Sequence, residues 1–265
     1  MAVGLALGSR ENFAVTEAAT VTFIGNEGVV VRNSRTAVAI DALFGDGAGE
    51  YADTPVALRD AIESARPPYD AIRLISATHF HPDHFNARAV IRHLSGNPDA
   101  SFVSTAQAVA LVVSAPGGVE VRDRLHGMNP PEGERTSIEV DGVRVEAFGL
   151  SHGKVHYDDV QHLGLVIYSG KFTMLHLGDG IIDQRALRRA GIFDEAIDMA
   201  FVPFWYLTYP FGRRLMGNLL RARRVFAMHI PPAEAAKLAS EVTASRPDAV
   251  ALVRPASTFS VPARA

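Results

Sequence analysis

Four potential metal ligands are concentrated in one short stretch of the chain. His79, His81, Asp83 and His84 directly follow a mostly apolar run that is typical of a buried strand. Pro82 disfavours the α conformation of the residue before it, so the stretch is predicted to form a loop and not a helix. His79 and His81 alternate along an extended backbone and therefore point to the same side, whereas Asp83 and His84 follow round the turn.

These residue types favour the binding of a divalent cation. Imidazole nitrogens and carboxylate oxygens suit a borderline ion such as Zn²⁺, and also Mn²⁺ or Fe²⁺. A single ion at a catalytic centre usually has three protein ligands and an open position. Four donors in one loop therefore predict two ions, or one ion with surplus residues. A lone histidine here would be interpreted as a surface residue or a helix cap, but three histidines with an aspartate favour metal binding.

Three later residues supply further donors. His152, Asp179 and His229 each stand just after an apolar run with strand character. Taken singly, each is most simply a loop residue, and Asp179 a helix cap. Their shared position at the carboxyl ends of strands, where such sheets place their sites, makes them candidate ligands.

The elements that must position these residues alternate between strands and helices. Predicted strands lie at 20–25, 28–33, 36–41, 71–78, 100–105, 196–204, 224–230 and 249–254, and predicted hairpins at 137–150 and 162–179. Predicted helices lie at 56–65, 86–95, 106–115, 184–191, 213–222 and 232–242. Two sheets packed face to face, with helices on both outer faces, would bury all the apolar runs. We therefore expect an α/β fold, a four-layered αββα sandwich, formed by one domain over residues 1–265 with an N-terminal extension at 1–19.

Composition excludes several classes of protein. The 265 residues are 48% hydrophobic and 21% charged, which argues against disorder. The formal net charge of −3 gives no general attraction to nucleic acid or to an anionic membrane. There is no cysteine, which excludes thiolate metal sites and a catalytic thiol. We expect a cytoplasmic protein, or a periplasmic one whose signal peptide has been removed, that binds a small-molecule substrate and forms a monomer or a homo-oligomer.

The ligand pattern resembles that of the metallo-β-lactamase-fold hydrolases, which carry an H-x-H-x-D-H motif. His79, His81, Asp83 and His84 match the motif, and the later histidine, aspartate and C-terminal histidine of that family match in order and in strand context. The resemblance covers nearly the whole chain. It implies two divalent metal ions, with one metal held by His79, His81 and His152. It further implies that Asp83, His84 and His229 hold the other metal and that Asp179 bridges the two; the complete implied set is His79, His81, Asp83, His84, His152, Asp179 and His229.

The resemblance also narrows the expected activity. True β-lactamases usually lack an aspartate at the position of Asp179 and often have a cysteine, so the pattern is more similar to the phosphodiesterase and lactonase branches. Flavodiiron proteins replace the second histidine of the motif with glutamate, and His81 argues against that branch. Two ions would share a water molecule and lower its pKa, so that the resulting hydroxide attacks a lactone or phosphoester. Asp83 and Asp179 are the candidate catalytic residues; the alternatives are a β-lactamase or promiscuous lactamase, and a metal-binding protein without turnover.

Other polar and aromatic residues leave two interpretations open. Lys154, His156 and Tyr157 would either bind a substrate anion and a developing oxyanion or form a solvated loop.

An aromatic stretch at 203–212 is predicted to be a loop that forms either a pocket wall or a packing contact. Its aromatic candidates are Trp205, Tyr206, Tyr209 and Phe211.

The remaining histidines are expected to be structural. His162 and His176 lie within the second predicted hairpin and are interpreted as satisfied core histidines or as residues behind the ligands. His93 falls in a predicted helix and His126 in a predicted loop.

Overall fold

The computed structural model describes residues 17–45, 49–153, 159–218 and 220–264. Most of the predicted N-terminal extension lies outside the described residues, and the first strand begins at Ala18. Within the described ranges, no helix is long and apolar enough to cross a membrane.

Two seven-stranded mixed sheets form the centre of the molecule. The first sheet contains, in spatial order, β14 (Thr258–Pro262), β1 (Ala18–Gly25), β2 (Gly28–Arg32), β3 (Ala37–Ile40), β4 (Ile72–Ala77), β5 (Ser101–Thr105) and β6 (Leu125–Met128). The second contains β13 (Val250–Ala251), β12 (Ala222–Met228), β11 (Ile197–Pro203), β10 (Phe172–His176), β9 (Leu163–Ser169), β8 (Val143–Gly149) and β7 (Arg135–Val140). In each sheet one half is antiparallel and the other half is parallel.

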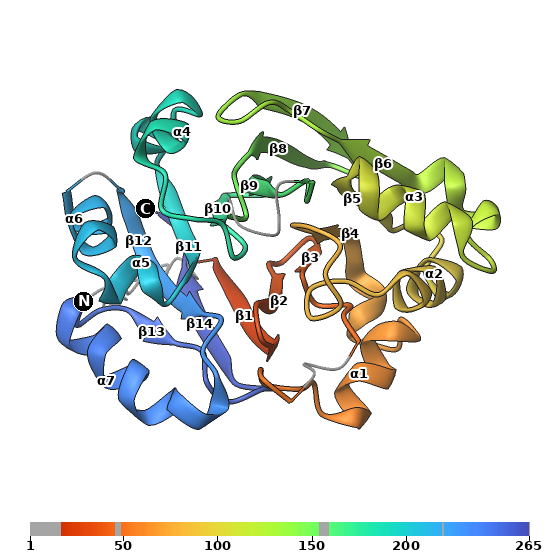
Figure 1. Cartoon of the computed structure of the whole chain (residues 1–265). Helices are drawn as coiled ribbons and strands as arrows, with labels where there is room; N and C mark the ends of the chain where they lie inside the picture. The colour runs from red at the N-terminus through yellow and green to blue at the C-terminus, as the bar shows by residue number, and fades with distance from the viewer. Residues whose placement is uncertain (1–16, 46–48, 154–158, 219, 265) are drawn as a thin grey trace, which may run out of the picture.

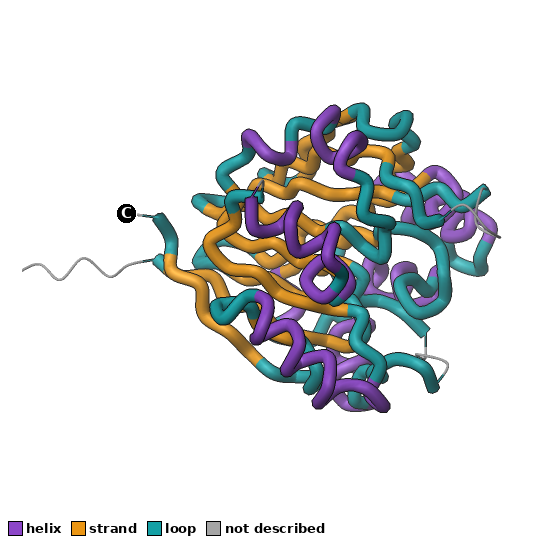
Figure 2. Tube along the Cα trace, turned by 60° about the vertical axis from the view of Figure 1, so that its left-hand side comes forward, coloured by secondary structure: helices purple, strands orange, loops and turns teal. Residues whose placement is uncertain are grey.

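Helices cover the outer faces of both sheets. The α-helices are α1 (Val56–Glu63), α2 (Ala87–Gly96), α3 (Ala106–Ser114), α4 (Gln184–Arg189), α5 (Trp205–Thr208), α6 (Pro210–Asn218) and α7 (Ala235–Ser245). Short 3₁₀ helices lie at Tyr69–Ala71, Val119–Arg124, Ile192–Asp194 and Pro232–Glu234. Figure 1 shows α1 to α3 on one side of the strands and α4 to α7 on the other. The rotated view in Figure 2 shows the strands gathered in the interior with helices around them.

Three apolar clusters correspond to the three interfaces between these layers. The central cluster joins inward-facing residues of both sheets, such as Val38 and Phe201. A second cluster packs β9 to β12 against α4 to α7, and a third packs the first sheet against α1 to α3. Alternation of side chains along each strand divides its apolar residues between the central and an outer cluster. The predicted αββα sandwich is therefore confirmed.

Several predicted elements need correction. The predicted closing strand at 249–254 is only the two-residue β13, and the chain then crosses to the first sheet as β14, which pairs with β1. The stretch 203–212, predicted to be a loop, contains α5 and the start of α6. Pro210 opens α6, where the missing N–H of proline costs nothing, so this proline marks a helix start. His126 lies in β6, not in a loop.

The topology brings the ends of several strands to one edge of the sandwich. β3 and β4 run parallel in the first sheet, and β10, β11 and β12 run parallel in the second. The loops that follow β4, β8, β10 and β12 carry all seven candidate ligands. The interface between the sheets is consequently also the base of the candidate site.

Removing a large side chain from the central cluster should destabilise the whole fold. Phe201 is fully buried and stacks on Phe226 with ring centroids 5.0 Å apart. We expect Phe201→Ala to lower the free energy of unfolding by about 3–5 kcal/mol, because it leaves a cavity between the sheets. Phe211→Ala, which removes the same side chain from a 44% exposed position, should change it by less than about 1 kcal/mol. Urea unfolding of both variants measures the difference; equal losses would contradict the assignment of the central core.

Candidate metal centre

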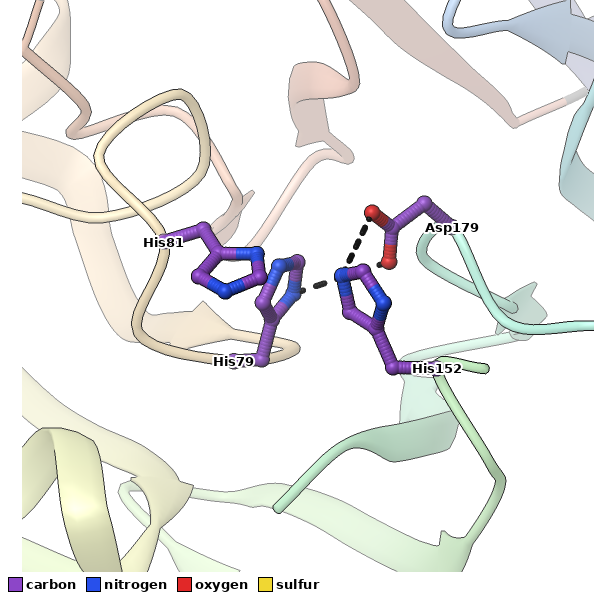
Figure 3. Close-up of side chains that lie close together, drawn as sticks. All are labelled: His79, His81, His152 and Asp179. Atoms are coloured by element: carbon purple, nitrogen blue, oxygen red, sulfur yellow. Dashed lines mark ion pairs between the residues drawn. The ribbon is translucent and has the colours of Figure 1, made fainter. Parts of the chain in front are cut away.

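The first group of donors comes from both sheets. His79 and His81 lie in the loop after β4, His152 lies after β8, and Asp179 lies after β10. Each offers one donor atom such that these atoms all lie within 4.8 Å of one another. Figure 3 shows the three imidazole rings and the carboxylate converging from separate loops. These four residues are suitably placed to hold one cation.

The second group lies beside the first. Asp83, His84 and His229 also offer donor atoms within 4.8 Å of one another. His229 has a φ of 59°, a left-handed conformation that few residues other than glycine adopt. Such strain commonly marks a functional residue. The structure thus brings together all seven residues that the sequence singled out, in the two groups that the resemblance implies.

The Asp179 carboxylate lies at the centre of both groups. One oxygen, Oδ2, lies 2.9 Å from Nε2 of His152, 3.7 Å from Nε2 of His84 and 3.8 Å from Nε2 of His229. The other oxygen, Oδ1, lies 3.8 Å from Nδ1 of His79. A single carboxylate therefore contacts members of both groups.

Asp41 positions the ligand loop from behind. Its carboxylate accepts hydrogen bonds from the backbone N–H of Thr78 at 2.7 Å and from the Thr78 hydroxyl at 2.8 Å. Its Oδ2 also lies 3.0 Å from Nδ1 of His84. The Asp41 side chain thereby orients the His84 ring so that Nε2 faces the second group. Sequence analysis missed this residue, although it ends the apolar run of β3 in the same way that the recognised ligands end theirs.

The turn between β1 and β2 supports the second group. The amide of Asn26 donates hydrogen bonds to Oδ2 of Asp83 at 3.1 Å and to its backbone carbonyl at 3.2 Å. Glu27 is fully buried, with one oxygen 3.7 Å from Nδ1 of His84. Burial raises the pKa of Glu27 well above its ordinary value, opposed by the nearby His84. Asn26 and Glu27 carried no sequence signal, because they lie in a turn of ordinary composition.

His162 and His176 occupy different positions relative to the site. His162 donates from Nδ1 to the carbonyl of Leu150 at 3.1 Å, and its Nε2 lies 3.2 Å from Oδ1 of Asp179. His162 therefore lies directly behind the central carboxylate without a hydrogen bond to it, which is one of the two positions that the sequence left open. His176 donates from Nε2 to the carbonyl of Glu27 at 3.2 Å and is a satisfied core histidine.

The other sequence candidates divide as follows. His93 is buried in α2 with Nδ1 2.6 Å from the carbonyl of Ile62, and His126 is half-buried; neither belongs to a donor group. Lys154, His156 and Tyr157 lie outside the described residues.

The aromatic stretch is only partly a pocket wall. Trp205 and Tyr209 line a cavity that also borders His229. Tyr206 is instead fully buried in the outer core, where its hydroxyl donates to the carbonyl of Ile181 at 2.6 Å. Phe211 is exposed. Of the four aromatic candidates, Trp205 and Tyr209 therefore line the cavity, whereas Tyr206 and Phe211 do not.

The protonation states of three donor histidines and of Asp179 fit the binding of divalent cations, whereas His84 would have to lose a proton when a metal binds. Burial lowers the pKa of His79 and of His81, and lowers the pKa of His229 to about 4, so these imidazoles are neutral at pH 7. Burial opposes ionisation of Asp179, but His79 and His84 hold its pKa well below the ordinary value. Neutral imidazoles and ionised carboxylates are the forms that bind metals. Nε2 of His79 and Nε2 of His84 are buried without a hydrogen-bond partner, an expensive arrangement that a bound cation would relieve.

Comparison with known proteins gives a consistent result. The family model described as "Beta-lactamase superfamily domain" matches residues 36–248. A search of curated protein sequences found no match.

Several solved structures share the fold. Igni18, a metallo hydrolase from Ignicoccus hospitalis, is 18% identical, with a TM-score of 0.64 over 93% of this chain and 100% of that chain. A possible metal-dependent hydrolase from Veillonella parvula is 14% identical, with a TM-score of 0.63 over 93% and 99%. An isothiocyanate hydrolase from Delia radicum gut bacteria is 16% identical, with a TM-score of 0.61 over 92% and 100%. At these identities the likeness establishes the fold.

In the metal-free protein, the pKa values of two neighbouring histidines should be shifted in opposite directions. Burial opposes the charge of His84, but Asp179 and Asp41 raise its pKa well above the ordinary value of ~6.5. His229, whose ring centroid is 5.8 Å away, should stay neutral down to about pH 4. The charge of His84 thus stabilises the fold below pH ~6.5 and this contribution is lost as the pH rises through its folded pKa, whereas His229 destabilises the fold as the pH falls from ~6.5 to about 4. NMR titration of the ring protons measures both; a lower pKa for His84 than for His229 would contradict the geometry.

Asp41→Asn should weaken the second group selectively. An amide carries no charge to hold the Nδ1 proton of His84, so we expect the affinity of the second group for Zn²⁺ to fall by about 10–100-fold. Competition titration with a chromogenic chelator measures this. Asp183→Asn is the matched control, because Asp183 only caps α4 and asparagine caps equally well. Unchanged affinity in Asp41→Asn would mean that Asp41 supports the loop without tuning the ligand.

Proposed function

The chain belongs to the β-lactamase superfamily and has the metallo-β-lactamase fold of metal-dependent hydrolases, and on this premise we propose that it hydrolyses ester-type bonds with two divalent ions. The proposed substrates are lactones or phosphoesters, and Zn²⁺ is the proposed metal, with Mn²⁺ and Fe²⁺ as alternatives. His79, His81 and His152 would hold one ion, and Asp83, His84 and His229 the other. Asp179 would bridge them.

The position of Asp179 is the observation that carries this proposal. Its Oδ2 faces His152 of the first group and both His84 and His229 of the second. A carboxylate within reach of two groups of donors is suited to binding two ions and not one. Each ion would have three ligands of its own and would share Asp179 with the other ion, whereas a closed structural site usually holds one ion with four ligands of its own.

The residues divide the work of hydrolysis between them. When bound, the ions would act as Lewis acids and would lower the pKa of a water molecule toward neutrality. The overall reaction adds water across the ester: a new C–O or P–O bond forms, the ester bond breaks, and the leaving oxygen takes a proton. Asp179 would hold the two groups of donors in a fixed position relative to each other. Asp83, whose pKa is lowered mainly by His84 against the effect of burial, would be an ionised ligand that can accept the proton released by the attacking water and pass it to the leaving oxygen.

The decisive experiment combines metal analysis with a substrate panel. Metal-loaded protein should contain up to two equivalents of Zn²⁺, Mn²⁺ or Fe by elemental analysis, and should hydrolyse members of a panel of lactones, phosphodiesters and β-lactams. Asp179→Ala should lower kcat/KM by at least about 100-fold and reduce the metal content, because it removes the shared ligand. His126→Ala, a change outside both donor groups, should retain the activity and the metal content.

Two results would overturn the proposal. Absence of bound metal after loading would remove its basis. Full activity of Asp179→Ala, in protein that circular dichroism shows to be folded, would contradict the bridging role.

A further inference from the structure

A cavity of about 590 Å³ opens directly beside the candidate metal centre. His152, Asp179 and His229 form one side of it. These residues belong to both donor groups, so a substrate held at the ions would extend into this space. The rest of the lining therefore bears on which substituent the substrate carries.

The remaining lining is apolar or aromatic. Ile181, Ile182 and Pro231 contribute aliphatic surface, and Trp205, Tyr209 and Tyr51 contribute rings. Apart from Tyr209, which is exposed, these side chains are neither fully buried nor fully exposed. Covering such surface with an apolar ligand is favourable, whereas a charged ligand group placed there would lose hydration without finding a partner.

Cationic side chains are missing where an anionic substituent would need them. Among the described residues that line this cavity there is no lysine or arginine. A second cavity, of about 570 Å³, shares His152 with the first, and its described lining likewise has no lysine or arginine but includes Glu132 and Asp159. Sites for multiply charged phosphates usually present arginine or lysine. The described lining of both cavities thus offers no cationic side chain to pair with an anionic substituent.

The aromatic side chains of the cavity pack against His229 and against the loop that carries Asp179. The Trp205 indole donates to the carbonyl of Gly180 at 3.4 Å, and its ring meets His229 edge to face at a centroid distance of 5.2 Å. The Tyr51 ring meets His229 from another direction at 4.2 Å. Burial raises the pKa of Tyr51 to about 12, so its phenol is uncharged at pH 7. The wall is therefore largely formed before a substrate binds.

We infer that the substrate carries an uncharged apolar substituent, aromatic or alkyl, beside the bond that is cleaved, and that this substituent occupies the cavity bordered by Ile182 and Trp205. Such a substituent differs from those of nucleotides and sugar phosphates, which are polar or anionic. This inference rests on the proposed ester hydrolysis and names its substrate class.

A series of matched esters tests the inference. The probes are phenyl acetate, butanoate, hexanoate and octanoate, together with the monophenyl ester of octanedioic acid, which adds a terminal carboxylate to an equally long chain. If the panel identifies phosphodiesters, the matching alkyl phenyl phosphodiesters replace them. We expect kcat/KM to rise up to about four-fold per buried methylene, and the carboxylated ester to react at least about tenfold more slowly than its neutral counterpart.

A charge introduced into the wall should reverse this preference. Ile182 lines the cavity and is not a proposed ligand. Ile182→Arg should lower kcat/KM for the octanoate ester, chiefly through a higher KM, and raise it for the carboxylated ester. Leu111→Arg, which adds the same charge at a 44% exposed position on α3, should leave both values unchanged. A merely disruptive effect of Ile182→Arg would lower both values and would not rescue the carboxylated substrate.

The outcomes separate the inference from the proposed function. If no ester in the panel or the series is hydrolysed by metal-loaded protein, the proposed function fails. If phenyl acetate is hydrolysed but kcat/KM neither rises with chain length nor falls with the terminal carboxylate, the function stands and the inference is wrong. A rise with chain length that Ile182→Arg leaves unaltered would place the substituent elsewhere and would also overturn the inference.

Discussion

The buried carboxylate of Asp179 is the interaction on which the site depends. It lies within 4 Å of five imidazole rings, those of His79, His84, His152, His162 and His229. Nearby carboxylates, with Asp179 among them, raise the pKa of the buried His84, so the charge of that ring would be costly to bury without this anion beside it. The rings come from loops of both sheets, so the carboxylate can collect them only if the two sheets pack at the correct distance. The packing of the two sheets against each other therefore also determines the geometry of the donor groups at their edge.

Much of the fold and the seven candidate ligands could be predicted from the sequence, because both leave local patterns. His79 to His84 form a dense motif, and His152, Asp179 and His229 each follow an apolar run. The supporting residues could not be found in this way. Asp41 reaches His84 across 43 positions and Asn26 reaches Asp83 across 57, so only the packed sheets reveal these contacts. Short elements were predicted less well: the strand expected at 249–254 is only the two-residue β13, and β14, which is half-exposed with little apolar content, was not predicted.

The aromatic stretch after β11 shows how one segment serves two layers. Tyr206 points into the outer core, whereas Trp205, its neighbour in α5, turns toward the metal centre. Adjacent residues of a helix point about 100° apart, so a single turn divides its side chains between fold and site. Composition alone cannot make this division, since an aromatic side chain can either pack in a core or line a pocket. The wall of the cavity is consequently anchored in the same core that supports the second sheet.

The pairing of β14 with β1 links the beginning of the sandwich to its end. Ala18 pairs with Pro262, so β1 is synthesised long before its partner β14. Until then β1 has a free side of unpaired N–H and C=O groups, the kind of edge at which chains associate with one another. Contacts between such distant positions also slow folding, because a long loop must close before they form. A variant that lacked only β14 would therefore combine an intact set of candidate ligands with an aggregation-prone edge at β1.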